Sequence, residues 1–201
     1  MRRLDLYALT VIFGGSLVSA SALVAATAYH SPAAAAAVSG TYRPPAPRAP
    51  AHVTLNIDTP KMLGGGESPA FIPANFTLPA NSDVVITVVN FDDATALPPG
   101  AEKDAVPTGT LGALSVQPMD AATPNAETPV TLVTSMDPAI GVSHTFTIAK
   151  LSLNVPIAPK SRTTFTIHTG DAGTYTWQCL VPCGDVAMAT PGYMEGRLTI
   201  A

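Results

Sequence analysis

The sequence has few charged residues, and they include no excess of basic ones. Only 12% of its 201 residues are charged, and the formal net charge is −4. A nucleic-acid groove needs clustered lysine and arginine, so we expect no nucleic-acid partner. The 47% hydrophobic content argues against a disordered charged arm. No serine–histidine–aspartate order, paired carboxylate cluster or glycine-rich phosphate loop stands out, so the sequence does not predict an enzyme.

Cysteine and histidine are also scarce. The chain has two cysteines and four histidines, and no histidine follows His168. Two cysteines cannot form a disulfide framework, so each has to be interpreted from its own position. The 20 prolines and 15 glycines disfavour long helices beyond the N-terminus.

The N-terminal segment is the one long apolar run. Arg2 and Arg3 precede an uncharged stretch from Leu6 to Tyr29, which as a helix would rise about 36 Å and cross a hydrocarbon core. Two alternatives stay open: a retained single anchor in the cell membrane, which we favour, and a cleaved signal segment. The two arginines place the N-terminus on the cytoplasmic side, so both alternatives put the remaining chain outside the cytoplasm.

Three regions follow from this pattern. Residues 1–30 form the anchor or signal segment, and residues 31–51 form an alanine- and proline-rich spacer, which we expect to be extended. Residues 52–201 form the folded domain. Within it, residues 92–128 fit the strand pattern poorly and are too long for an ordinary connection, so we interpret them as an insertion.

The folded domain reads as a series of short strands. From His52 onward, apolar and polar residues tend to alternate, with breaks at proline, glycine and asparagine. This pattern predicts an all-β fold, an antiparallel sandwich or barrel. The expected strands are 52–58, 71–79, 83–91, 130–134, 143–148, 163–169, 173–179 and 196–201.

Alternation along these strands places three soft or borderline metal ligands on the inward face. They are His144, Cys179 and Met194, each in phase with apolar neighbours on its own strand. Taken singly, each is also an ordinary core residue. Together, an imidazole, a thiolate and a thioether belong to the ligand set of blue-copper electron carriers. The neighbours that set the phase are Phe146, Ile148, Tyr175, Trp177, Leu198 and Ile200.

Several segments resemble the C-terminal half of a cupredoxin. They are Val142 to Ile148, Leu153 to Ile157, Gly173 to Cys179 and Pro191 to Gly196. The resemblance implies a cupredoxin-like Greek-key β-sandwich. It also implies that His144 is the first imidazole ligand of a copper ion, Cys179 the thiolate and Met194 the axial thioether.

The sequence departs from that family at one ligand. The family places a second histidine between the cysteine and the methionine, and this chain has none there. The segment Cys179-Leu180-Val181-Pro182-Cys183-Gly184 instead resembles the two-copper loop of cytochrome c oxidase subunit II, which also expects a histidine.

Three outcomes stay open at the missing ligand. Cys183 can complete a mononuclear site with His144, Cys179 and Met194, suited to Cu(I), and we favour this site over a binuclear one. Asp185 or Met188 can take the position instead. Alternatively, Cys179 and Cys183 form a disulfide and leave a metal-free module.

The expected function follows from these alternatives. The first is a copper-binding protein that transfers electrons or holds Cu(I) outside the cytoplasm, with a redox protein or a respiratory complex as its partner. The second is a metal-free interaction or assembly module of the same fold.

Overall fold

The computed structural model describes residues 49–66, 68–120 and 128–201. The predicted anchor or signal segment and nearly all of the predicted spacer lie outside these residues. Within them, no helix has both the length and the apolar character needed to span a membrane.

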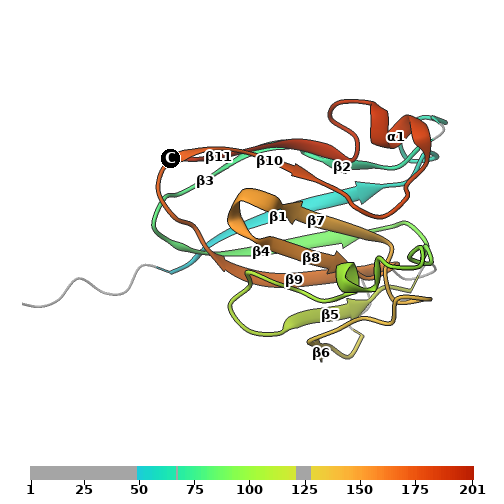
Figure 1. Cartoon of the computed structure of the whole chain (residues 1–201), viewed down its shortest axis with the longest axis horizontal. Helices are drawn as coiled ribbons and strands as arrows, with labels where there is room; N and C mark the ends of the chain where they lie inside the picture. Colours follow the sequence, from blue (N-terminus) through green and yellow to red (C-terminus); the bar gives the residue numbers. More distant parts are fainter. Residues whose placement is uncertain (1–48, 67, 121–127) are drawn as a thin grey trace, which may run out of the picture. The chain divides into compact units, whose positions relative to one another are not determined.

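Two β-sheets face each other, and this confirms the predicted all-β sandwich (Figure 1). The first sheet has the strand order β2 (Ala70–Ile72), β1 (Ala51–Asp58), β4 (Asp83–Asn90), β9 (Ser161–His168), β5 (Leu114–Pro118) and β6 (Thr131–Val133). The second has the order β3 (Asn75–Leu78), β11 (Glu195–Ile200), β10 (Gly173–Gln178), β7 (His144–Ile148) and β8 (Leu153–Ile157). The described helices are short: η1 (Glu102–Ala105), η2 (Ala149–Leu151) and α1 (Asp185–Ala189).

Buried apolar side chains, which alternate with exposed ones along the strands, pack between the two sheets. Along β4, Val84, Ile86 and Val88 are fully buried, while the residues between them are partly exposed. This is the pattern of a strand with one face on the core. Strand β7 differs, because all five of its residues are buried. Both faces of the strand that begins with His144 are therefore covered.

The chain passes from one sheet to the other between β2 and β3, at the cis peptide bond Ile72–Pro73. As a result, β1 runs parallel to β4 in the first sheet, and β3 runs parallel to β11 in the second. The remaining pairings are antiparallel. Strands from distant parts of the sequence therefore lie side by side.

The segment 92–128 contains a strand of the first sheet. Strand β5 pairs antiparallel with β9 on one side and with β6 on the other. Only Leu114 and Val116 alternate inward on β5, and the strand ends at Pro118, so its sequence signal is weak.

Strand β8, which includes Pro156, was likewise not among the expected strands. It lies at the edge of the second sheet, where proline is tolerated.

An aromatic cluster fills the core beneath one end of the sandwich. The Trp177 ring lies 4.8 Å from Phe71 and 5.5 Å from Phe146, measured between ring centroids. The indole Nε1–H of Trp177 donates to the carbonyl oxygen of Ala74 at 2.8 Å. The Phe71 and His144 rings pack edge to face, with their centroids 6.3 Å apart. This cluster supports His144 from the inside.

Candidate metal centre

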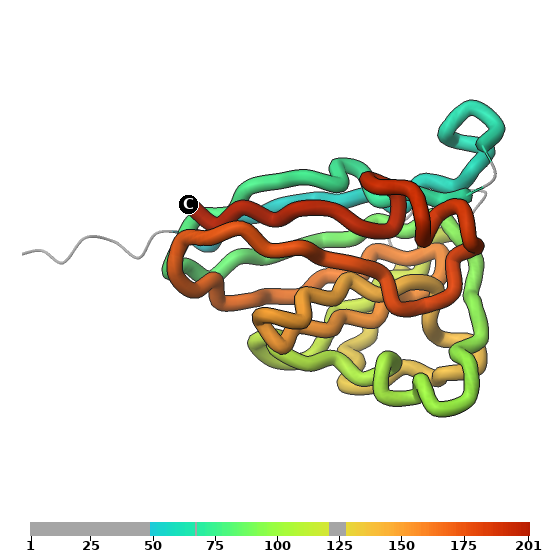
Figure 2. Tube along the Cα trace, turned by 45° about the horizontal axis from the view of Figure 1, so that its top comes forward, coloured from blue at the N-terminus to red at the C-terminus, as the bar shows by residue number. Residues whose placement is uncertain are grey.

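The candidate site lies at the end of the sandwich opposite the C-terminus. His144 is the first residue of β7, and Cys179 follows the last residue of β10. Cys183 lies in the loop that leads from β10 into α1. Figure 2 shows the C-terminus at one end of the two sheets and this loop at the other.

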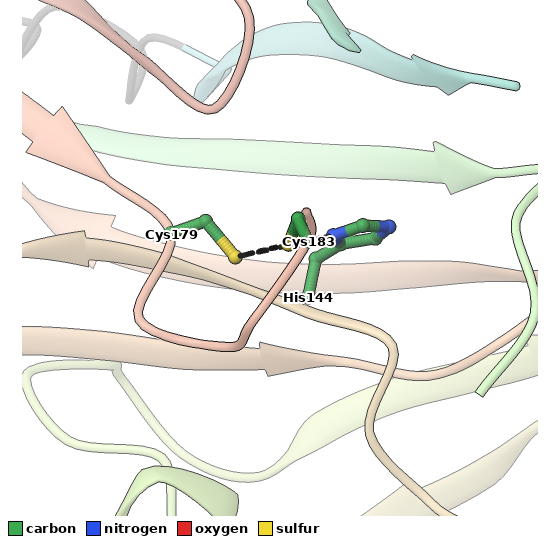
Figure 3. Close-up of side chains that lie close together, drawn as sticks. All are labelled: His144, Cys179 and Cys183. Carbon is green, nitrogen blue, oxygen red and sulfur yellow. Dashed lines mark hydrogen bonds between the residues drawn. The ribbon is translucent and has the colours of Figure 1, made fainter. Parts of the chain in front are cut away.

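Three donor atoms converge at this end. The Nδ1 atom of His144 lies 3.0 Å from the sulfur of Cys183 and 3.9 Å from that of Cys179. The two sulfurs are 3.2 Å apart, and both cysteines are free (Figure 3). All three atoms lie within 4.8 Å of one another, a spacing that a single metal ion can bridge.

The site is closed on the core side and open on one edge. His144 is 2% exposed and Cys179 is 1% exposed, whereas Cys183 is only partly buried. Cys183 is therefore the donor that is nearest to solvent. His144 and Cys179 form the buried, closely packed side of the site.

Backbone hydrogen bonds hold the two ligand segments together. The sulfur of Cys179 accepts from the backbone N–H of Thr145 at 3.4 Å, and the hydroxyl oxygen of Thr145 accepts from the N–H of Leu180 at 2.8 Å. The N–H of Cys179 donates to the carbonyl oxygen of Met194 at 2.8 Å. These bonds fix the start of β7, the end of β10 and the residue before β11 relative to one another.

Asp92 completes the surroundings of His144. Its Oδ2 atom lies 3.1 Å from His144 Nε2, the ring nitrogen that faces away from the sulfurs. Sequence reasoning missed this residue because it lies in the segment interpreted as an insertion. Its position two residues after the buried strand β4 could have indicated it, because β4 ends at the end of the sandwich where β7 begins with His144.

The two cysteine thiols differ in acidity. Burial on its own would raise the pKa of Cys179, but hydrogen bonds with Cys183 and His144 and the nearby imidazolium charge hold this pKa well below its ordinary value of 9.0. The pKa of Cys183 is raised, first because its S–H donates to the Cys179 thiolate and second because it is itself buried. Without metal, Cys179 is therefore the more acidic of the two thiols.

His144 and Asp92 form a charge-assisted pair. Burial alone would lower the pKa of His144, but the hydrogen bond with Asp92 and the contact with Cys179 outweigh it, so this pKa lies above 6.5. The hydrogen bond with His144 lowers the pKa of Asp92 below 3.8, although burial opposes the shift. The hydrogen bond thus favours the charged forms of both His144 and Asp92.

The remaining predicted ligands divide into two groups. Met194 is 1% exposed, and its backbone carbonyl accepts the hydrogen bond from Cys179. This contact involves the backbone and not the sulfur, so the role of Met194 as an axial ligand stays a prediction. Asp185 and Met188 are on α1 and exposed. His168, at the end of β9, is also exposed and pairs with Asp83 at 2.7 Å. It does not supply the missing imidazole.

The donor set fits one soft metal ion. Thiolates favour Cu(I) and zinc, and imidazole suits copper and zinc. The site has two sulfurs and one imidazole nitrogen, and the backbone carbonyl of the buried Met194 is hydrogen-bonded to Cys179. His144, Cys179 and Cys183 would hold the ion, and their single cluster fits a mononuclear copper.

Comparison with known proteins finds similar solved structures only. No protein-family model matches the chain, and no curated protein matches it. Its structural neighbours include cupredoxins and multicopper oxidases. The chain is 18% identical to auracyanin A, a blue copper protein from Chloroflexus aurantiacus, with 76% of this chain and 100% of that chain covered and a TM-score of 0.35.

Two further solved structures are similar to the chain. Reduced auracyanin from Roseiflexus castenholzii is 15% identical, with 77% of this chain and 99% of that chain covered and a TM-score of 0.34. A purple cupredoxin from Nitrosopumilus maritimus is 13% identical, with 74% and 99% covered and a TM-score of 0.27. What the site does has to be argued from its own atoms.

Proposed function

We propose that this protein binds one copper ion through His144, Cys179 and Cys183 and serves in single-electron transfer or Cu(I) holding. The observation that carries the proposal is the convergence of one imidazole nitrogen and two sulfurs within 4.8 Å at one end of a packed sandwich. Met194 would add its thioether sulfur as a weaker ligand.

The surrounding residues suit electron transfer. The copper supplies the chemistry by alternating between Cu(I) and Cu(II). His144 and Cys179 are fixed by the Phe71 ring and by the backbone N–H of Thr145, so the ligand positions change little between the two states. Small rearrangement of the ligands lowers the barrier to electron transfer. Cys183 is the partly exposed ligand, so a redox partner would approach the copper at this residue.

The proposal includes a location outside the cytoplasm. Arg2, Arg3 and the apolar stretch from Leu6 to Tyr29 support a single N-terminal anchor in the cell membrane or a cleaved signal. Either would place the copper site among extracytoplasmic redox proteins or beside a respiratory complex.

Copper loading tests the proposal. The reduced protein is loaded with Cu(I) without oxygen, the bound metal is counted by elemental analysis, and the sample is then oxidised. We expect one copper per chain and, after oxidation, an intense thiolate-to-copper charge-transfer band. His144→Ala should lose stoichiometric copper, whereas His168→Ala, the matched control away from the site, should retain it. Equal copper content in both variants would refute the proposal, and two coppers per chain would refute the mononuclear site.

One observation favours a second function. The sulfurs of Cys179 and Cys183 are 3.2 Å apart, so a small movement brings them to disulfide distance. The protein would then be a metal-free interaction module. Thiol titration of protein purified without reductant separates the two: two reactive thiols support the copper site, and none supports the disulfide module.

A further inference from the structure

Both ring nitrogens of His144 have a partner. Nδ1 faces the two sulfurs, at 3.0 Å from Cys183 and 3.9 Å from Cys179, while Nε2 faces Asp92 Oδ2 at 3.1 Å. The His144 side chain is 2% exposed, so water does not compete for either nitrogen. The two sides of the ring therefore have different chemical surroundings, sulfur on one and carboxylate on the other.

This arrangement selects one tautomer of the neutral ring. A neutral imidazole carries one N–H, and the nitrogen that binds a metal has to be the other one. An ionised carboxylate only accepts hydrogen bonds. Asp92 Oδ2 lies 3.1 Å from Nε2, whereas the sulfur of Cys179, the more acidic thiol, lies 3.9 Å from Nδ1. Asp92 is therefore the nearer acceptor and keeps the proton on Nε2, and the Nδ1 lone pair is directed at Cys179 and Cys183.

Asp92 is itself held in place from both sides. Its Oδ1 accepts from the N–H of Asp93 at 3.0 Å, and its own N–H donates to Asn90 Oδ1 at 3.0 Å. Its carbonyl oxygen accepts from the N–H of Lys160 at 3.0 Å. Asn90 is fully buried and donates to the carbonyl oxygen of Ala158 at 2.9 Å. The carboxylate is thus fixed to β4 and to the turn before β9.

We propose that Asp92 is a positioning residue that prepares His144 to bind copper through Nδ1. The inference rests on the proposed function, since it assigns a role at the same site. Carboxylates that accept the second N–H of a metal-binding histidine orient the ring and raise its basicity, and their loss typically costs about 10–100-fold in metal affinity.

Cu(I) affinity is the first measurement. Competition with a chromophoric Cu(I) chelator is run on the wild type, Asp92→Leu and Asp92→Asn. We expect Asp92→Leu to weaken Cu(I) binding about 10–100-fold, and Asp92→Asn, which retains an acceptor oxygen, to lose less. Asp93→Asn is the matched control, because the neighbouring Asp93 carboxylate pairs with Lys160 and not with His144; it should bind as the wild type does. Equal affinity of Asp92→Leu and the wild type would overturn the proposal.

The tautomer is the second measurement, and it needs no metal. In ¹⁵N NMR of the reduced, metal-free protein, at a pH alkaline enough to neutralise the ring, we expect His144 to carry its proton on Nε2. Asp92→Leu should shift the population toward the Nδ1–H form. An unchanged tautomer population in Asp92→Leu would overturn the positioning role. A wild type that binds no Cu(I) but shows this tautomer shift would refute the proposed function and leave the positioning of His144 supported.

Discussion

Asp58 carries a local electrostatic cost at the end of β1. Its Oδ1 atom is buried and has no hydrogen-bond partner in the part of the chain that the structure describes. Burial raises its pKa above 3.8. A carboxylate with a raised pKa in the folded state binds its proton more tightly there than in the unfolded chain, so its contribution to stability is complete below pH 3.8 and is lost as the pH rises through the folded value.

The Asp58→Asn variant tests this cost. At pH 7 the variant removes a partly buried, unsatisfied charge, so its thermal midpoint should lie above that of the wild type. The gain should disappear at a pH below 3.8, where the wild-type carboxyl is already protonated. Thermal unfolding followed by circular dichroism at both pH values checks the prediction. A gain of the same size at both values would show that the charge is not its cause.

Single residues differ in how much their sequence context predicts. Along β10 and the residue that follows it, alternation correctly predicts that Trp177 and Cys179 point inward. On β7 it predicts little, because both faces of the strand are buried and Thr145 is as covered as His144. Cys183 lies in a loop, where side chains follow no period. Its place beside His144 depends on how the loop turns, which alternation does not encode.

At the scale of elements, Gly196 allows β3, β10 and β11 to approach closely. It pairs with Trp177 across β10 and β11. A Cβ atom at residue 196 would lie 2.0 Å from the carbonyl oxygen of Ala74 and 2.6 Å from Trp177 Nε1. Those two atoms are joined by the 2.8 Å hydrogen bond that ties Trp177 to the segment before β3. The absence of a side chain at Gly196 keeps this bond intact.

We expect Gly196→Ala to destabilise the protein by about 2–3 kcal/mol, because the added methyl group meets backbone and has no room to move. Gly170→Ala is the matched control, since a Cβ atom there has no neighbour within 4 Å. Urea unfolding measures both variants. Equal stability of Gly196→Ala and the wild type would mean that β3 shifts without cost.

At the scale of elements, the longest strands are the ones that the sequence predicts most clearly. Strands such as β1, β4 and β9 are eight residues long and alternate throughout, so their periodicity is evident. Strand β5 is shorter and ends in proline, and its place in the sheet comes from pairing with β9 and β6. Pairing between distant segments is a tertiary property, and this is why the segment 92–128 was interpreted as an insertion.

At the scale of the whole molecule, the candidate site joins the two sheets. Asp92 follows β4 of the first sheet, whereas His144 begins β7 of the second. Cys179 follows β10, also of the second sheet, and accepts a hydrogen bond from β7. Bound metal would therefore link β7 to the loop after β10, and Asp92 ties His144 to the first sheet.

Copper should accordingly raise the global stability of the reduced protein. A ligand that binds only the folded state, at a free concentration one hundred times its dissociation constant, adds about 2.7 kcal/mol. The gain here should be positive but smaller. Cys179 and Cys183 remain neighbours in the unfolded chain and keep some affinity for Cu(I), whereas His144 moves away from them. Anaerobic urea unfolding with and without Cu(I), followed by circular dichroism, measures the gain. His144→Ala removes the donor that only folding brings to the sulfurs, so most of the gain should vanish in this variant and persist in His168→Ala. A gain of equal size in His144→Ala would mean that the cysteines bind copper without the sandwich, and that the fold does not build the site.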